Sequence, residues 1–195
     1  MSLTWGTDYF VPFNGSNYEL YSEAKYNSEC LIANKHKDVN YAIVRIPFVM
    51  SKDDDYSDPL NSRLERYVKA VMTGEDINPR NIDYRYNFVE AGDEAEFLYY
   101  LANSDYKGVV NFASSGDISI REVIDYVEKK TGKRAIYSEN AKVFPFTNHP
   151  EVSMELSICN ELGYKPLELK KLLFHSEEGD GKIDDYIKRI INNQD

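Results

Sequence analysis

Hydrophobic positions along the chain follow two patterns that alternate in a regular way. Apolar residues recur at helical spacing in residues 18–37 and again in 119–131, which predicts helices with one apolar face. Residues 41–47 and 108–113 are short apolar runs without alternation, typical of strands buried on both faces of a parallel sheet. Because such strands and helices follow one another along the chain, the sequence predicts an α/β fold.

Local signals bound the other predicted elements. Gly74 and Gly132 are expected to end two helices, and Ser119 with Glu122 has the spacing of a capping box. Asp93 stands at the start of a helix, where its carboxylate is expected to accept an amide of the first turn. Further strands are expected at 87–91 and 134–137, and further helices through Arg66 and Met72, at 93–103, at 153–162, around Leu172 and at 183–191.

Composition narrows the class of protein. The 195 residues are 42% hydrophobic and 29% charged, as in a globular protein with one sizeable core. No stretch approaches the roughly 20 apolar residues that cross a membrane, and the first residues have no secretory pattern, so a cytoplasmic protein is expected. A net charge of -10 without a basic cluster argues against nucleic acid as a partner.

The cysteines and histidines indicate neither a disulfide nor a metal centre. Cys30 and Cys159 lie in helical patterns of a chain without secretory features, where free thiols are expected. His36, His149 and His175 have no companion ligands at the spacing of a zinc site. We therefore predict no metal site.

A tyrosine and a lysine four residues apart are the first candidates for catalysis. Tyr21 and Lys25 are expected on one face of the 18–37 helix, within reach of each other. A tyrosine has a reference pKa of about 10, and a nearby cation favours its ionised form, which can exchange a proton with an alcohol or a ketone. The spacing also arises by chance among 16 tyrosines, and its second copy, Tyr126 and Lys130, is expected on a helix surface without a catalytic role.

The order of motifs along the chain resembles the NAD-dependent epimerase/dehydratase group of the extended short-chain dehydrogenase/reductase family. The helix with Tyr21 and Lys25 is followed, as in that family, by Val44-Arg45-Ile46-Pro47, by Asn87-Phe88-Val89-Glu90-Ala91-Gly92-Asp93-Glu94-Ala95, by Gly108-Val109-Val110-Asn111-Phe112-Ala113-Ser114-Ser115-Gly116 with Ser119-Ile120-Arg121-Glu122, and by Glu161-Leu162-Gly163-Tyr164-Lys165-Pro166. Each motif is weak alone. Five in the correct order cover roughly three quarters of the chain, so it is identified as a member of this family.

The resemblance implies an enzyme that uses NAD or NADP and acts on a nucleotide sugar or a related small molecule. Tyr21 would be the catalytic acid and base, and Lys25 would hold the nicotinamide ribose and assist the tyrosine through its positive charge. Pro47 would also contact the cofactor, while Arg45 and Phe48 would contact the substrate. Epimerase, dehydratase and reductase activity all stay open.

Several features of the family are missing from the sequence. No Gly-x-Gly-x-x-Gly or related turn occurs, although this turn holds the pyrophosphate of the dinucleotide at a helix N-terminus. Thr4-Trp5-Gly6 resembles the segment after the third catalytic residue, which places that hydroxyl at or before position 1. Phe48 stands where many members have an asparagine for the substrate diphosphate, and a phenyl ring cannot hydrogen-bond phosphate. Arg85 lies one position before the family's arginine.

We therefore expect the C-terminal part of such an enzyme, with an incomplete cofactor site and no activity alone. Its α/β fold would join part of a Rossmann-like parallel sheet, residues 1–50 and 86–114, to the small α/β substrate-binding lobe, residues 51–85 and 115–195. An unpaired sheet edge favours a homodimer. The alternative is a naturally short, non-catalytic relative that acts as a binding or assembly module, in which Tyr21 and Lys25 are relics.

Overall fold

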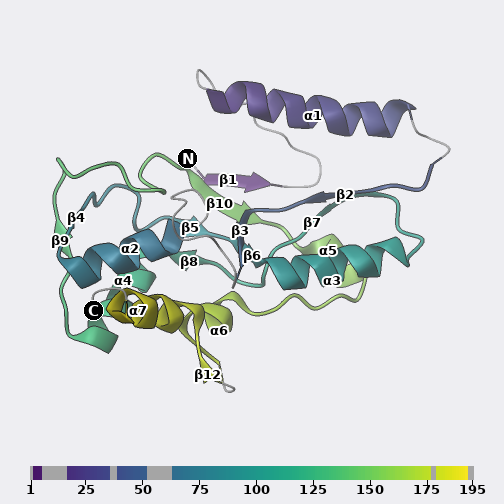
Figure 1. Cartoon of the computed structure of the whole chain (residues 1–195). Helices are drawn as coiled ribbons and strands as arrows, with labels where there is room; N and C mark the ends of the chain where they lie inside the picture. The colour runs from purple at the N-terminus through teal and green to yellow at the C-terminus, as the bar shows by residue number, and fades with distance from the viewer. Residues whose placement is uncertain (1, 6–16, 36–38, 52–62, 177–178, 193–195) are drawn as a thin grey trace.

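The architecture is mixed α/β, as predicted, and most of the strand pairs are parallel (Figure 1). The structure is a computed structural model that describes residues 2–5, 17–35, 39–51, 63–176 and 179–192. Among these residues, no helix combines the length and the apolar character needed to cross a membrane.

The strand predicted at 41–47 is present as β2, and a separate strand, β3, follows it after two residues. β2 (Ala42–Arg45) pairs in parallel with β7 (Gly108–Asn111). β3 (Phe48–Met50) pairs in parallel with β6 (Phe88–Glu90). The chain therefore changes its neighbour between residues 45 and 48, where Pro47 lacks the amide hydrogen that an unbroken ladder needs.

β2 is less buried than the sequence predicted. Ala42 is exposed, and Ile43, Val44 and Arg45 are only half-buried. The reason is its position, because β7 is the only strand paired with β2 in the described part of the chain. Strands of such apolar composition are usually covered on both faces, and the described residues cover β2 only in part.

A second, four-stranded sheet joins segments that are far apart in the sequence. Its order is β1 (Ser2–Trp5), β10 (Glu151–Met154), β5 (Arg85–Tyr86) and β8 (Ile118–Ser119). The first three strands are parallel, and β8 is antiparallel to β5. Two smaller pairs complete the strands: β4 (Asp76–Ile77) with β9 (Ile136–Tyr137), and β11 (His175–Ser176) with β12 (Gly179–Asp180).

The helix predicted at 153–162 is wrong in its first part. Residues up to Met154 belong to β10, and α5 (Ser157–Glu161) begins only afterwards. Val152 explains the difference, because it is buried between β1 and β5. Pairing with distant strands overrides the local helical preference of this segment.

The larger hydrophobic core lies among four helices and the four-stranded sheet. α2 (Arg63–Thr73), α4 (Ile120–Thr131) and α7 (Lys182–Asn192) pack on one another, and α6 (Leu169–Phe174) packs on α7 (Figure 1). Gly181 permits the close approach of α7 to α6, since a Cβ atom there would lie 2.5 Å from the carbonyl oxygen of Leu173. Most of the buried hydrophobic side chains among the described residues belong to this core.

The predicted helix boundaries at α4 are confirmed. Ser119 and Glu122 form both hydrogen bonds of a capping box, and Gly132 ends the helix in the left-handed conformation with φ 73°. Gly74 likewise follows the last residue of α2 with φ 73°. These signals act within one helical turn, so the sequence alone determines them.

The smaller core lies between β7, α3 (Ala91–Ala102) and α5. The rings of Phe97 and Phe112 stack with centroids 4.1 Å apart, next to the buried Cys159. Burial, and then the negative charge of Asp93, raises the pKa of the Cys159 thiol to about 11. Both cysteines are free, and Cys30 is half-buried.

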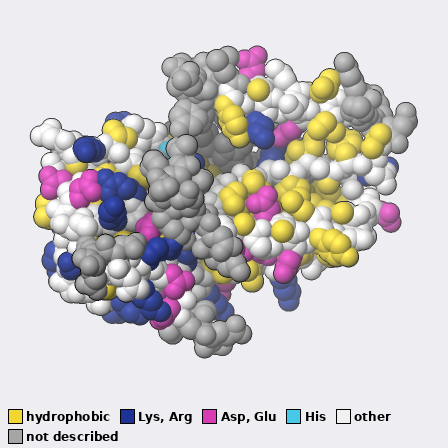
Figure 2. All heavy atoms as spheres, viewed as in Figure 1, with side chains coloured by type: hydrophobic (Ala, Val, Ile, Leu, Met, Phe, Trp, Pro, Cys, Tyr) yellow, Lys and Arg dark blue, Asp and Glu magenta, His cyan; other side chains and the backbone are white. Residues whose placement is uncertain are grey.

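α1 (Asn17–Lys35) stands apart from both cores. It has no extensive contact with another described element, and Figure 1 places it beyond β1 and β2. In Figure 2, hydrophobic side chains gather on the half of the surface that carries α1 and α3, and charged side chains on the other half. Exposed apolar residues on the first half include Tyr21, Tyr26, Leu31, Leu98 and Tyr99.

Candidate functional site

Tyr21 and Lys25 lie together on α1, as their spacing predicts. The Nζ atom of Lys25 is 5.8 Å from the centre of the Tyr21 ring. The tyrosine is 62% exposed, so its hydroxyl is open to a ligand. Glu29 follows at the same four-residue interval, and the three side chains therefore form one stripe along the helix.

An ion pair ties this stripe to the end of β2. Arg45 Nη2 lies 2.6 Å from Glu29 Oε2, and its Nε lies 3.1 Å and 3.2 Å from the two carboxylate oxygens. Both side chains are mostly buried, which strengthens such a charge-assisted, two-armed contact. The predicted substrate contact Arg45 therefore binds the helix that carries Tyr21. Sequence reasoning missed Glu29, although its place in the four-residue stripe was a signal for it.

Pro47 and Phe48, the other predicted contacts, lie where the chain passes from β2 to β3. Pro47 is half-buried. The ring of Phe48 packs at the edge of the larger core, 5.1 Å from Phe146 and 5.5 Å from His149 between ring centres. The guanidinium of Arg63, at the start of α2, lies 4.9 Å from the centre of the same ring. The role of Phe48 in substrate binding stays a prediction, and its observed contacts are aromatic and cationic.

The electrostatic surroundings of Phe48 favour a neutral histidine. Burial, and then the positive charge of Arg63, lowers the pKa of His149. The backbone carbonyl of His149 accepts a hydrogen bond from Asn81 Nδ2 at 3.1 Å. The imidazole at this position is therefore an uncharged packing partner at neutral pH.

The candidate residues fit one end of a nicotinamide dinucleotide. A phenol and an ammonium on one exposed helix face are suited to the ribose and nicotinamide. The pyrophosphate end needs a glycine-rich turn at a helix N-terminus, and the sequence contains none. The expected third catalytic hydroxyl, at or before position 1, lies outside the described residues. Among the described residues, no cluster of three metal-ligating side chains occurs.

Comparisons with known proteins find similarity in structure rather than in sequence. No protein-family model and no curated protein matches the sequence. UDP-N-acetylglucosamine 4-epimerase from Methanobrevibacter ruminantium, in complex with UDP-N-acetylmuramic acid, matches 89% of this chain with a TM-score of 0.64 and 19% identity. ADP-L-glycero-D-manno-heptose-6-epimerase from Helicobacter pylori matches 94% with a TM-score of 0.65 and 17% identity. A mutant UDP-glucuronic acid 4-epimerase from Bacillus cereus, in complex with a fluorinated UDP-sugar and NAD, matches 97% with a TM-score of 0.68 and 18% identity.

The chain has the fold of the sugar-nucleotide epimerases. It spans 54% of the Methanobrevibacter and Helicobacter chains and 58% of the Bacillus chain, which is about half of their length. The match over nearly the whole of this chain agrees with the resemblance in its sequence motifs and with a C-terminal part of that fold.

The motif at 87–95 contacts the motif at 161–166 through Asp93. This role differs from the one predicted for Asp93, which was to cap a helix. Glu90, not Asp93, caps α3, because its carboxylate accepts the amide of residue 93 at 3.0 Å. The buried carboxylate of Asp93 instead accepts the hydroxyl of Tyr164 at 3.0 Å and the amide of Leu167 at 2.9 Å. Asp93 therefore joins α3 to the segment after α5.

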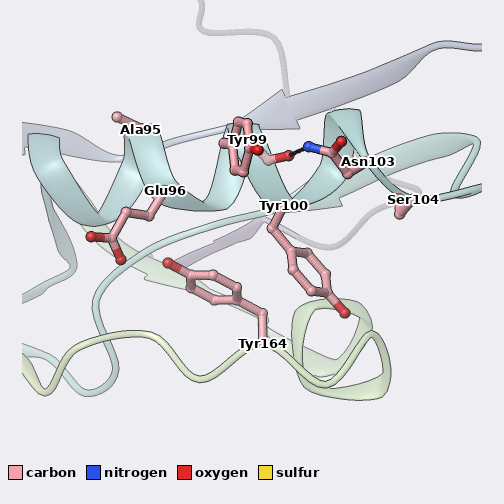
Figure 3. A pocket seen from close by; sticks show the side chains of 7 residues that line it. All are labelled: Ala95, Glu96, Tyr99, Tyr100, Asn103, Ser104 and Tyr164. Carbon is pink, nitrogen blue, oxygen red and sulfur yellow. Dashed lines mark hydrogen bonds between the residues drawn. The ribbon is translucent and has the colours of Figure 1, made fainter.

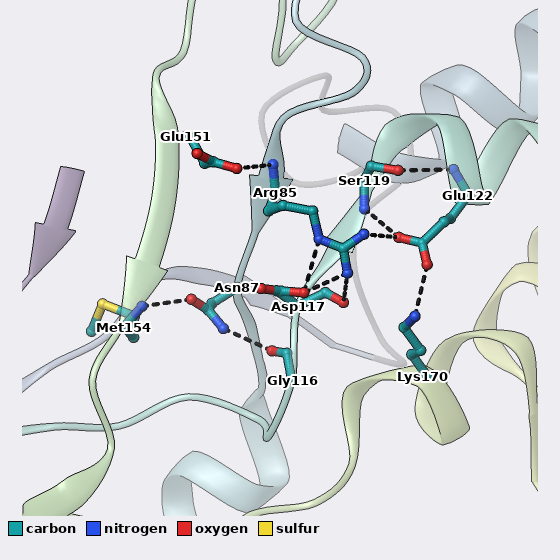
Figure 4. Close-up of polar contacts among 9 residues, drawn as sticks. All are labelled: Arg85, Asn87, Gly116, Asp117, Ser119, Glu122, Glu151, Met154 and Lys170. Carbon is teal, nitrogen blue, oxygen red and sulfur yellow. Dashed lines mark hydrogen bonds and ion pairs between the residues drawn. The ribbon is translucent and has the colours of Figure 1, made fainter. Parts of the chain in front are cut away.

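A second network joins β5 to the start of α4 (Figure 4). Arg85 Nε donates to Asp117 at 2.9 Å, and its Nη1 donates to Glu122 at 2.7 Å. Burial opposes ionisation of Glu122, but hydrogen bonds from Lys170 and the Ser119 amide and the charge of Arg85 outweigh it and lower the pKa of Glu122. The carboxylates of Asp117 and Glu122 therefore fix the side chain of Arg85.

The second tyrosine–lysine pair was predicted to lie on a plain helix surface, and this prediction is wrong. The hydroxyl of Tyr126 on α4 lies 2.8 Å from Asp184 Oδ2 on α7 and also contacts the carbonyl oxygen of Phe174. Lys130 Nζ lies 3.1 Å from Asp184 Oδ1. Asp184 is only 3% exposed, so this pair joins two helices of the larger core.

Proposed function

We propose that this chain is the C-terminal part of an NAD(P)-dependent sugar-nucleotide epimerase or a closely related dehydratase or reductase. The observation that carries the proposal is the match to epimerase structures over nearly all of this chain and only about half of theirs. Supporting it, the four motifs after the Tyr21 helix occur in the order that the family has. A nucleotide sugar is the proposed substrate class, as in the complexes of the neighbours.

Tyr21 is the proposed acid and base. Its exposed hydroxyl would exchange a proton with a hydroxyl group of the sugar, within hydrogen-bond reach. Bound NAD would supply the reversible removal of a hydride from the same sugar carbon. Lys25, beside the Tyr21 ring, would hold the ribose hydroxyls, and Pro47 would line the cofactor.

Arg45 would act by positioning rather than by contact with the reacting atoms. Its ion pair with Glu29 fixes α1 against the end of β2 and so determines where Tyr21 stands. In open α/β sheets, ligands bind outside the carboxyl ends of parallel strands. Arg45 lies at the carboxyl end of β2, and Phe48 begins β3 shortly after it. The ring of Phe48 would form one wall of the substrate site, and other groups would have to bind the diphosphate.

The free side of β2 is the proposed place of the missing strands. In the described part of the chain, β7 occupies one side of β2 and no strand occupies the other. A glycine-rich βαβ segment of the same polypeptide would pair there and complete the cofactor site. Without it, a second copy of the chain is the expected partner of this edge, and the chain alone is expected to be inactive.

Calorimetric titration with NAD tests this proposal. The 195-residue chain is expected to give no saturable binding, whereas a longer protein, extended by the in-frame segment encoded upstream, is expected to bind NAD. Lys25→Ala should weaken binding to the longer protein by about tenfold, since one charged hydrogen bond is lost. Arg134→Ala removes a highly exposed cation between α4 and β9; it is the matched control and should leave NAD binding unchanged.

Two outcomes would contradict the proposal. Saturable NAD binding by the 195-residue chain, weakened by Lys25→Ala, would mean that the cofactor site is substantially complete without further strands. A start codon at residue 1 together with no NAD binding would favour the non-catalytic binding or assembly module.

A further inference from the structure

A groove on the outer face of α3 lies outside the proposed active site and contains none of its residues. It has a volume of about 690 Å³ and is bounded by Glu96, Tyr99 and Tyr100 of α3, by Asn103 directly after this helix and by Tyr164 from the segment after α5 (Figure 3). Small-molecule sites commonly have volumes of roughly 300–1,000 Å³ and aromatic linings. The groove is therefore of suitable size and composition for a small ligand.

Two of the three tyrosine rings in this groove are held in place by their hydroxyl groups. Tyr100 donates to the carbonyl oxygen of Leu162, and Tyr164 donates to the carboxylate of Asp93. The centres of these two rings are 5.5 Å apart. The third ring, Tyr99, is 75% exposed. Because two hydroxyls are already bonded within the protein, these rings offer a ligand their faces and edges.

The electrostatic potential of the groove is negative from three sources. Glu96 places a carboxylate at the end of the groove where the hydroxyl of Tyr164 lies (Figure 3). Asn103 marks the C-terminal, negative end of the α3 dipole, whose last turn has no basic residue. Tyrosine faces carry negative partial charge. Consistent with this, burial raises the pKa of Tyr164, followed by its hydrogen bond to Asp93 and the negative charges of Asp93 and Glu96.

We propose that the α3 groove binds the alkylated ammonium group of a small, soluble organic cation. Alkyl groups on nitrogen match the apolar rings, and the spread positive charge matches Glu96 and the tyrosine faces. The groove residues include no lysine or arginine, so an anion would meet only repulsion. A bare metal ion would find a single carboxylate, and no metal-ligating cluster occurs among the described residues.

The charge of the ligand separates this proposal from simple apolar binding. The probes are choline and its neutral analogue 3,3-dimethylbutan-1-ol, which has the same shape with carbon in place of nitrogen. Each is titrated into the full chain while amide chemical shifts of α3 are followed by NMR. Choline is expected to bind saturably with a Kd of about 1–10 mM, as a few exposed cation–π contacts permit, and the neutral analogue at least about fivefold more weakly.

Matched variants locate the site. Glu96→Gln removes the charge and keeps the shape, and Tyr99→Ala removes an exposed ring, so each should weaken choline binding by about fivefold. Glu139→Gln changes an exposed carboxylate that follows β9 and is not part of the groove, so it should leave choline binding unchanged. Far-UV circular dichroism of each variant ensures that a lost signal does not report unfolding.

Three results would overturn the proposal. They are equal binding of choline and its neutral analogue, binding unaffected by Glu96→Gln, and no shift of α3 amides at choline concentrations up to about 100 mM. Retention on phosphatidylcholine vesicles with no binding of free choline would overturn the assignment to a soluble ligand. NAD binding plays no part in these measurements, so failure here and failure of the proposed function are distinguishable.

Discussion

The two tyrosine–lysine pairs of this protein have the same internal geometry and different surroundings. Lys25 Nζ lies 5.8 Å from the ring centre of Tyr21, and Lys130 Nζ lies 5.7 Å from that of Tyr126. The first pair stands on a helix with little contact to the rest of the described chain. The second shares a buried carboxylate, Asp184, between two helices of the larger core.

The four-residue spacing is therefore a property of helices and not of a catalytic site. A helix brings residues i and i+4 together wherever they occur. Function depends on what the hydroxyl can reach. The Tyr126 hydroxyl is committed to Asp184 and Phe174, whereas Tyr21 is 62% exposed on a helix anchored by Arg45. The second pair therefore joins two helices of the larger core, whereas the tyrosine of the first pair stays exposed.

Removal of each hydroxyl gives the largest expected contrast. In a form of the protein that turns over a nucleotide sugar, Tyr21→Phe should lower kcat by about 1,000-fold, because general acid and base catalysis contributes about 100- to 10,000-fold. Tyr126→Phe should leave kcat within about twofold, since the hydroxyl that it removes is bonded within the larger core, to Asp184 and Phe174. Steady-state kinetics of both variants is the measurement, and equal losses of kcat would refute the assignment of Tyr21.

Removal of the shared carboxylate should give the largest effect on stability. Asp184→Ala deletes the contacts to Tyr126, Lys130 and the amide of Gly181. We expect a loss of about 2–3 kcal/mol in the free energy of unfolding, as for hydrogen bonds to a buried charged group. Urea denaturation followed by circular dichroism measures it. Glu139→Ala, an exposed carboxylate, is the control and should change it by less than about 0.5 kcal/mol.

How far the sequence predicts these features depends on the distance along the chain over which each contact acts. The capping box of Ser119 and Glu122 and the stop at Gly132 were correct because they act within one helical turn. The bond from Tyr164 to Asp93 spans 71 residues, and the ion pair of Arg45 with Glu29 spans 16. A local pattern can point to a residue, as the four-residue stripe points to Glu29, but it does not identify the distant partner of that residue.

The candidate site was predictable in part for the same reason. Tyr21 and Lys25 met as expected because one helix carries both. The ion pair that anchors this helix could not be predicted without the tertiary fold. The same holds for the contact of the second pair with Asp184. The strand β10 also displaced the start of a predicted helix, since its partners β1 and β5 come from elsewhere in the sequence.

The anchor of the first pair is more exposed than Asp184 and should show a smaller effect. Arg45→Met keeps the apolar stem and removes the ion pair with Glu29, so we expect a loss of about 1–2 kcal/mol in overall stability. Hydrogen exchange of the α1 amides should rise, while that of α7 stays unchanged. Arg134→Met, in a pair whose arginine is highly exposed, is the control. Unchanged exchange in α1 would mean that the ion pair does not hold the helix.

The smallest expected effect is the pH dependence of the Tyr126 contact. Burial, and then the hydrogen bond to Asp184 and its charge, raises the pKa of Tyr126 above its usual value of 10, although Lys130 opposes this. The folded state therefore favours the neutral hydroxyl, and its contribution is complete below about pH 10 and declines as the pH rises further.

Tyr126→Phe should accordingly lower the free energy of unfolding by about 1 kcal/mol at neutral pH. The difference between wild type and variant should stay constant between about pH 7 and 9 and shrink above about pH 10, because only the wild type loses this contribution. Urea denaturation at several pH values measures the difference. A difference that grows at high pH would contradict the observed bond, since it would mean that the folded protein favours the ionised tyrosine.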